Sequence, residues 1–192
     1  MDNPNSRYKI VTIQQLQKFI LDYRENHSGE LTLLHVGAGP KPDPKLLDGY
    51  KVTRTDLHVQ THNTIKMDVC EPFPFKDESF DVIYSSNVFE HLHYPWITGS
   101  ECSRVCKSGG LNVHLAPFSW RYHPVPEDYF RYSHVGFVSL FPNSKTLLSG
   151  YDLSIRRKDV RGIYENKSDA VPLDDLGGWR EHWETLVVLR KI

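Results

Sequence analysis

Cysteine is scarce in this chain. Its 192 residues include three cysteines, Cys70, Cys102 and Cys106, and none of them forms a CxxC pair. An odd number of cysteines without a secretory context favours reduced thiols in a cytosolic protein over a disulfide framework. Cys102 and Cys106 are four apart in a predicted helix, and we predict that they are small buried residues rather than metal ligands or redox groups.

Metal-binding motifs are also lacking. The chain has no HExxH motif and no cysteine and histidine set at zinc-ligand spacing. The stretch Glu90-His91-Leu92-His93 does contain two histidines, but they are two positions apart, and a helix points such residues to different faces. We predict no metal site, with His93 on the surface.

Long apolar runs and an excess of one charge are absent as well. The first ten residues, MDNPNSRYKI, lack the apolar core of a signal peptide, and no segment is long and apolar enough to cross a bilayer. The formal net charge is −1, and no basic stripe stands out. These absences predict a soluble, cytoplasmic protein that binds neither membranes nor nucleic acids, and the length predicts a single domain over residues 1–192.

The pattern of apolar residues predicts an α/β protein. Apolar positions at three- and four-residue steps indicate helices, and short apolar runs bounded by turn residues indicate strands. Strands that alternate with helices favour a parallel sheet. The predicted helices cover residues 12–26, 95–107 and 133–140, and the predicted strands cover residues 31–36, 51–57, 65–69, 80–85, 111–116, 151–160 and 183–190.

Two connections in this pattern are short. About seven residues separate the second predicted strand from the third, whereas a parallel crossover needs roughly a dozen or more. Between the first two strands, only residues 43–47 can form about one helical turn. We therefore predict that the crossovers after the first and second strands are trimmed.

A glycine pair follows the first predicted strand. Gly37 and Gly39 stand where open α/β sheets bind ligands, and glycine lets a ligand approach the backbone closely. A dinucleotide loop needs a third glycine and a helix start, but this chain continues with PKPDP, which cannot start a regular helix. A diphosphate cofactor is therefore disfavoured, and by itself the pair fits a tight strand-exit turn equally well.

The segments that follow add to this loop in a characteristic order. The second strand ends at Asp56, where a carboxylate can accept hydrogen bonds from two ribose hydroxyls. Next come MDV, FPFKDESFDVIYSSNVFEHL and CKSGGLNVHLAPF. In this order the motifs of residues 31–118 resemble those of class I S-adenosylmethionine-dependent methyltransferases of the small-molecule type. The resemblance implies a Rossmann-like fold with a mostly parallel seven-stranded sheet whose last strand is antiparallel. It also implies S-adenosyl-L-methionine as the cofactor.

The resemblance also implies roles for individual residues. Gly37 and Gly39 let the methionine and ribose part of the cofactor lie on the backbone, and Asp56 holds the ribose. Asp68 accepts a hydrogen bond from the adenine amino group beside the backbone of Val69.

Three further positions belong to the same expected cofactor site. Asn87 and His91 line the pocket near the methionine end. His35 occupies the position of a family acid that helps to hold the amino group of the cofactor; a neutral histidine can accept a hydrogen bond there, and a protonated one repels. Lys41 replaces the third family glycine.

The segment APFSWRYHPVPEDYFRYS, residues 116–133, is the expected acceptor wall. It follows the fifth strand and is rich in aromatic residues. His123 is the candidate general base, and Asp128 orients it or forms an ion pair with Arg131. Alternatively, these residues only brace a proline-rich loop against the sheet.

The predicted function is methyl transfer from S-adenosylmethionine to an oxygen or nitrogen atom of a small molecule. Residues 1–30 supply an N-terminal helix, 31–118 the cofactor half and 119–192 the substrate half. His35, Lys41 and the short crossovers keep one alternative open, an inactive methyltransferase-like domain that acts as a binding or regulatory partner. A protein or RNA methyltransferase is disfavoured, because SSNV stands where NPPY or DPPY is typical.

Overall fold

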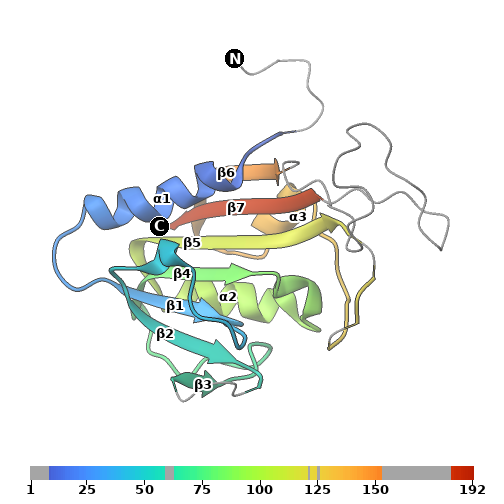
Figure 1. The fold of residues 1–192 in the computed structure, drawn as a ribbon, viewed down its shortest axis with the longest axis horizontal. Helices are drawn as coiled ribbons and strands as arrows, with labels where there is room; N and C mark the ends of the chain where they lie inside the picture. Colours follow the sequence, from blue (N-terminus) through green and yellow to red (C-terminus); the bar gives the residue numbers. More distant parts are fainter. Residues whose placement is uncertain (1–8, 59–62, 121, 125, 153–182) are drawn as a thin grey trace.

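The computed structural model describes residues 9–58, 63–120, 122–124, 126–152 and 183–192. These residues build one seven-stranded sheet with the strand order β3-β2-β1-β4-β5-β7-β6, which runs from one edge of the molecule to the other (Figure 1). The strands are β1 Thr32–Val36, β2 Lys51–Asp56, β3 Thr64–Lys66, β4 Phe80–Ser86, β5 Cys106–Ser119, β6 Ser144–Asp152 and β7 Trp183–Lys191.

Most neighbouring strands in this sheet are parallel. β1 pairs in parallel with β2 and β4, β2 with β3, and β4 with β5. β7 is inserted between β5 and β6 and is antiparallel to both. The predicted mostly parallel seven-stranded sheet with an antiparallel last strand is therefore confirmed. The carboxyl ends of β1 to β5 meet at one edge, which is where open α/β sheets bind ligands.

Helices cover both faces of the sheet. The helical segments are α1 Ile13–Glu25, η1 Lys45–Leu47, η2 Phe89–His91, α2 Pro95–Val105 and α3 His134–Val138. Leu16 and Ile20 of α1 pack in one core with Leu33. On the opposite face, Leu34 belongs to a second core with residues of α2, α3 and η2. Neighbouring residues of β1 therefore serve opposite faces, as expected for a central strand buried on both sides.

The connections after the first two strands are trimmed, as predicted. The chain from β1 to β2 contains the three-residue η1 and no α-helix. Residues 57–63 join β2 to β3, of which 59–62 lie outside the described residues. None of the described helices is long and apolar enough to cross a membrane.

Several predicted boundaries were wrong. The sixth strand was predicted at residues 151–160, but β6 spans Ser144–Asp152 and pairs with β7 over that range; residues 153–160 lie outside the described part. β3 has only three residues. The fifth strand was predicted to begin at residue 111, but β5 begins at Cys106. The glycine pair expected to end the preceding helix lies inside this strand, where Gly109 adopts a positive φ of 79°.

Candidate functional site

A cavity of about 490 Å³ lies at the carboxyl edge of the sheet. Its size is that of a small-molecule pocket. Its wall comes from the ends of β1 to β4, from the segment after η2 and from the loop after β5. The lining residues are Gly37, Asp56, Leu57, His58, Met67, Asp68, Val69, Cys70, Glu71, Asn87, Val88, His91, Leu92, His93, Tyr94, Pro126, Glu127 and Tyr129. We call the members from 37 to 88 the strand-end wall, and residues 120–132 the 120–132 loop.

The glycine turn after β1 is sterically specified. Gly37 has a φ of +64°, and a Cβ built there would lie 2.4 Å from Val88 Cγ2. Both facts disfavour a side chain at this position. Gly39 also has a positive φ, of +61°, but its surroundings are open, and it is not among the described residues that line the cavity. The turn brings the backbone of Gly37 to the cavity surface.

Asp56 ends β2 with its carboxylate fixed by two backbone amides. The Gly39 N–H donates to Oδ2 and the His58 N–H donates to Oδ1, each at 2.9 Å. A carboxylate offers about four lone-pair sites, so two remain for a ligand. Asp56 is thus oriented by the loops on either side of it and lines the cavity.

Asp68 and Val69 form the next part of the strand-end wall. Asp68 is exposed, and its Oδ1 accepts from the Cys70 N–H at 2.9 Å. Val69 is buried, and its carbonyl accepts from Thr98 Oγ1 at 2.7 Å, which ties this turn to α2. The apolar side of the wall and its exposed carboxylate therefore come from adjacent residues.

Asn87 and His91 line the cavity after β4. Asn87 adopts a φ of +53°, and its N–H donates to the Leu115 carbonyl at 3.0 Å. His91 Nδ1 donates to the Glu127 carbonyl, which fixes a proton on Nδ1. Six of the predicted cofactor residues, Gly37, Asp56, Asp68, Val69, Asn87 and His91, thus surround one cavity.

His35 has a partner elsewhere. Its side chain is buried, and its Nδ1 lies 2.7 Å from Asp43 Oδ1. Desolvation lowers the pKa of His35, although Asp43 acts in the opposite direction. Among the described lining residues His35 does not appear. Its assignment to the cofactor site stays a prediction.

The same Asp43 pairs with Arg54, and this pair holds the loop between β1 and β2. Arg54 Nη1 donates to Asp43 Oδ1, and Nη2 donates to the carbonyls of Gly39 at 2.9 Å and Lys41 at 2.8 Å. Arg54 is itself buried. One guanidinium therefore ties down the proline-rich segment that cannot form a helix.

In the 120–132 loop, polar side chains mainly pair with each other. The Asp128 side chain is 1% exposed and accepts from Arg131 Nη2 at 2.6 Å and from the His123 N–H at 2.8 Å. His123 Nδ1 lies 3.2 Å from the same carboxylate. The Arg131 guanidinium is the main cause that lowers the pKa of Asp128 to about 2. Neither His123 nor Asp128 is among the described lining residues of the cavity.

The loop docks on η2 through the backbone. The Glu90 carbonyl accepts from the N–H groups of Tyr129, at 2.7 Å, and Phe130, at 3.2 Å. The Tyr132 hydroxyl donates to the Phe89 carbonyl at 2.9 Å. These bonds hold the loop against η2, in which Glu90 is fully buried.

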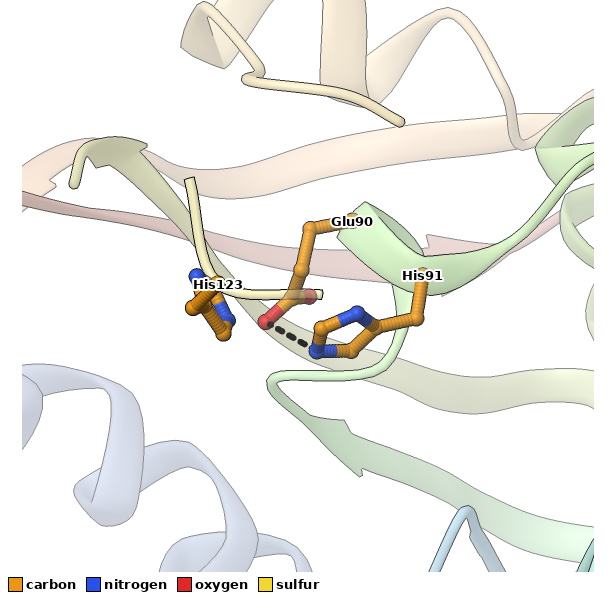
Figure 2. Close-up of side chains that lie close together, drawn as sticks. All are labelled: Glu90, His91 and His123. Carbon is orange, nitrogen blue, oxygen red and sulfur yellow. Dashed lines mark ion pairs between the residues drawn. The ribbon is translucent and has the colours of Figure 1, made fainter. Parts of the chain in front are cut away.

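Glu90 is the residue that sequence reasoning missed. It is fully buried, and neither carboxylate oxygen has a hydrogen-bond partner among the described residues. Desolvation raises its pKa to about 8. Figure 2 shows the Glu90 carboxylate facing the rings of His91 and His123, and ligand atoms of the three residues lie within 4.8 Å of one another. No local pattern signals this cluster, because His123 is far from the other two along the chain.

The motif FPFKDESFD has a structural explanation. Arg104 of α2 donates to the carbonyls of Phe73 and Phe75 and pairs with Asp77 at 2.7 Å. Glu101 Oε2 accepts from the Phe73 N–H at 2.6 Å. These contacts anchor the turn before β4 to α2, so the acidic and aromatic residues of the motif position the strand-end wall.

Part of the chain matches the model of a known protein family. Residues 34–113 match the family model described as a methyltransferase domain. This segment runs from β1 into β5 and so contains the whole strand-end wall.

Curated relatives point the same way. An uncharacterized methyltransferase of Mycolicibacterium vanbaalenii is 34% identical over 126 residues, which cover 50% of this chain and 47% of the relative. One from Mycobacterium tuberculosis is 37% identical over 90 residues, 44% of this chain and 33% of the relative. The chain thus spans half or less of the length of these relatives.

Solved structures share the fold at low identity. A putative methyltransferase of Bacillus halodurans aligns with a TM-score of 0.66 and 13% identity over 91% of this chain and 98% of that one. Geranyl diphosphate C-methyltransferase of Streptomyces coelicolor, in complex with Mg²⁺, geranyl diphosphate and S-adenosyl-L-homocysteine, aligns with a TM-score of 0.62 and 11% identity, over 93% of this chain and 78% of that one. A putative methyltransferase of Haloferax volcanii, in complex with the Trm112 activator, aligns with a TM-score of 0.58 and 18% identity, over 91% and 92% of the two chains.

Proposed function

We propose that this chain, which carries a class I S-adenosylmethionine-dependent methyltransferase domain, transfers a methyl group to an oxygen or nitrogen atom of a small molecule. The observation that carries the proposal is the gathering of Gly37, Asp56, Asp68 and Asn87 around one cavity at the carboxyl edge of the sheet. The cofactor supplies a methyl group activated by its sulfonium.

The chemistry of the strand-end wall fits an adenosine with an amino-acid tail. Asp56, held by two amides, keeps lone pairs for the ribose hydroxyls. The exposed Asp68 can accept from the adenine amino group, beside the apolar Val69. The glycine turn lets the tail approach the backbone at Gly37, where a side chain is disfavoured.

The other end of the cavity suits an acceptor with an apolar or aromatic part. Tyr94 and Tyr129 line it, and His93 lies between them, with ring centroids 4.5 Å from Tyr94 and 5.0 Å from Tyr129. Aromatic walls exclude water and hold flat or apolar groups. Alignment of this kind can supply roughly 7–11 kcal/mol of the barrier reduction.

His123 and Asp128 are the pair from which a proton acceptor can come. Asp128 holds the Nδ1 side of the ring, the arrangement that orients a histidine base. The ring centroid of His123 is 5.0 Å from that of His91 in the cavity wall. Methyl transfer needs a base only when the acceptor must lose its proton during attack, so loss of His123 is expected to lower kcat by about 10²–10⁴-fold for such an acceptor.

The first test is calorimetric titration with S-adenosylhomocysteine. We expect binding with one molecule per chain. Absence of binding at high micromolar ligand contradicts the proposal. Cofactor binding without transfer to any acceptor in a small-molecule panel supports instead a binding or regulatory domain.

The variant Asp56→Ala tests the ribose contact. It is expected to weaken S-adenosylhomocysteine binding by about 1.5–3 kcal/mol, the range of a hydrogen bond to a charged group. Asp48→Ala, an exposed carboxylate that is not among the described lining residues, is the matched control and is expected to bind normally. Unchanged affinity in Asp56→Ala removes this residue from the site.

A further inference from the structure

We infer that Glu90, His91 and His123 form a binding site for a divalent transition-metal ion at the wall of the cavity. The three side chains come from η2 and from the 120–132 loop, and their ligand atoms already lie within 4.8 Å of one another (Figure 2). The site belongs to the folded chain rather than to a sequence motif, since the loop must dock on η2 before it exists.

Glu90 is the strongest reason for a ligand at this place. A buried carboxylate without hydrogen bonds is costly, and native proteins rarely retain one without a partner. Both oxygens of Glu90 lack a hydrogen-bond partner among the described residues, the side chain is 0% exposed, and its ion-pair contact with His91 Nε2 is long, at 3.6 Å. A cation held between these oxygens and the two rings compensates this cost.

The distance between Glu90 and His91 favours a shared metal ion over a direct hydrogen bond. Glu90 Oε1 and His91 Nε2 are 3.6 Å apart, too far for a hydrogen bond. Two ligands bonded to one tetrahedral ion at about 2.1 Å are separated by about 3.4 Å. The observed separation therefore matches two ligands of a shared ion, and the third needs a modest side-chain adjustment.

The outer contacts are those of metal-binding histidines. A ligating histidine usually donates its other ring N–H to a carbonyl or carboxylate, which fixes the tautomer. His91 Nδ1 donates to the Glu127 carbonyl, and His123 Nδ1 lies 3.2 Å from Asp128 Oδ2. Each ring is thus held on its Nδ1 side, as in metal-binding histidines.

The ligand set selects the kind of ion. Two imidazoles and one carboxylate suit Zn²⁺, Fe²⁺ or Co²⁺, whereas Mg²⁺ prefers oxygen ligands in octahedral geometry. His91 lines the cavity, so an ion held by it lies at the cavity wall. On the proposed function, an acceptor oxygen can complete the coordination, and the ion lowers the pKa of an acceptor hydroxyl. The lone pair of His123 then serves as a ligand instead of a base.

The test is calorimetric titration of chelator-treated full-length protein with ZnCl₂, with MgCl₂ in parallel. We expect one Zn²⁺ per chain and no Mg²⁺ binding. Glu90→Gln, His91→Ala and His123→Ala are each expected to weaken Zn²⁺ binding at least about 100-fold, the upper end of what loss of an outer contact costs. His27→Ala, which removes an exposed histidine that is not among the described lining residues of the cavity, is the matched control and is expected to bind Zn²⁺ normally.

A second readout guards against misfolded variants. Co²⁺ bound by two histidines and a carboxylate gives visible d–d absorption, which we expect in the wild type and His27→Ala but not in the nearly isosteric Glu90→Gln. Thermal melting without metal checks that each variant is folded. The inference is overturned if the wild type binds no Zn²⁺, if it binds Mg²⁺ as tightly as Zn²⁺, or if His27→Ala weakens Zn²⁺ binding as much as the ligand variants do. Titration of the same samples with S-adenosylhomocysteine tests the proposed function separately. Zn²⁺ binding and S-adenosylhomocysteine binding can each fail without the other.

Discussion

The strand-end wall and the 120–132 loop meet at one cavity but are built in different ways. In the wall, backbone amides orient the carboxylates, as at Asp56, and Asp68 remains exposed. In the loop, the carboxylate of Asp128 is buried and already accepts hydrogen bonds from Arg131 and from the His123 N–H. Carboxylates of the wall are therefore available to a ligand, whereas the loop carboxylate mainly holds the loop together. Variants of the carboxylates in the two regions should therefore fail in different assays, ligand binding for the wall and stability for the loop.

The largest expected effect is on the glycine turn of the wall. Gly37→Ala is expected to lower the free energy of unfolding by roughly 3–4 kcal/mol, because left-handed backbone strain adds to the clash with Val88. Gly29→Ala, at φ +94° with open surroundings, should cost only the strain of about 1–2 kcal/mol. Urea denaturation measures both, and the double variant Gly37→Ala/Val88→Ala should recover part of the loss. Equal losses in the two single variants contradict the close packing of the turn.

The ion pair of the 120–132 loop should come next. Asp128→Ala is expected to cost about 3 kcal/mol of unfolding free energy, the lower end for a broken buried pair, because the Arg131 side chain is 25% exposed. Asp77, the ion-pair partner of Arg104, has a side chain that is 75% exposed. Asp77→Ala should therefore lower the free energy of unfolding by less than about 1 kcal/mol. If urea denaturation gives both variants the same small loss, the loop is held by something other than this pair.

His114, a buried histidine that belongs to neither region, is expected to make the free energy of unfolding depend on pH. His114 of β5 is fully buried against Phe141, and burial lowers its pKa to about 3. Below about pH 6.5 the unfolded chain binds a proton here that the folded chain does not. The free energy of unfolding should therefore fall by roughly 1.4 kcal/mol per pH unit as the pH drops from 6.5 towards 3.

The variant His114→Gln isolates this contribution. It keeps a polar group near Ser85 Oγ, which lies 2.7 Å from His114 Nδ1, but cannot titrate. Urea denaturation between pH 7 and pH 5 should show a shallower loss in the variant than in the wild type. Parallel curves contradict a neutral buried His114.

The smallest expected effect sharpens the comparison most directly. Asp68→Asn should weaken S-adenosylhomocysteine binding by about 1 kcal/mol and leave the free energy of unfolding within about 0.5 kcal/mol, because Asp68 is exposed. Asp48→Asn, at an exposed carboxylate that is not among the described lining residues, is the control and should bind normally. A stability loss comparable to that of Asp128→Ala shows that the two regions are built alike.

The wall could be predicted from the sequence because its residues follow strands in a regular order. The end of each parallel strand reaches the same edge of the sheet, so Gly37, Asp56 and Asn87 come together once the strands are placed. The boundaries of β6 were not predictable in the same way, because its ends depend on pairing with β7. Local periodicity contains no information on that partner.

The partners of the histidines could not be predicted either. His35 was assigned by analogy to the cofactor, but the shortened loop after β1 brings Asp43 to its ring. Glu90 reads as part of a helix-like motif, and only the docking of Tyr129 and Phe130 on its carbonyl shows that it is covered. Such contacts join distant segments, and composition or spacing carries no signal for them.

The single guanidinium behind the trimmed first crossover has a consequence for substitution. Arg54 spans one carboxylate and two carbonyls with a rigid planar fork, in a connection that contains no α-helix. Lysine has the same charge, but a compact ammonium on a flexible stem cannot reach all three acceptors at once. The short connection between β1 and β2 therefore depends on arginine at position 54, and Arg54→Lys is not a conservative substitution there.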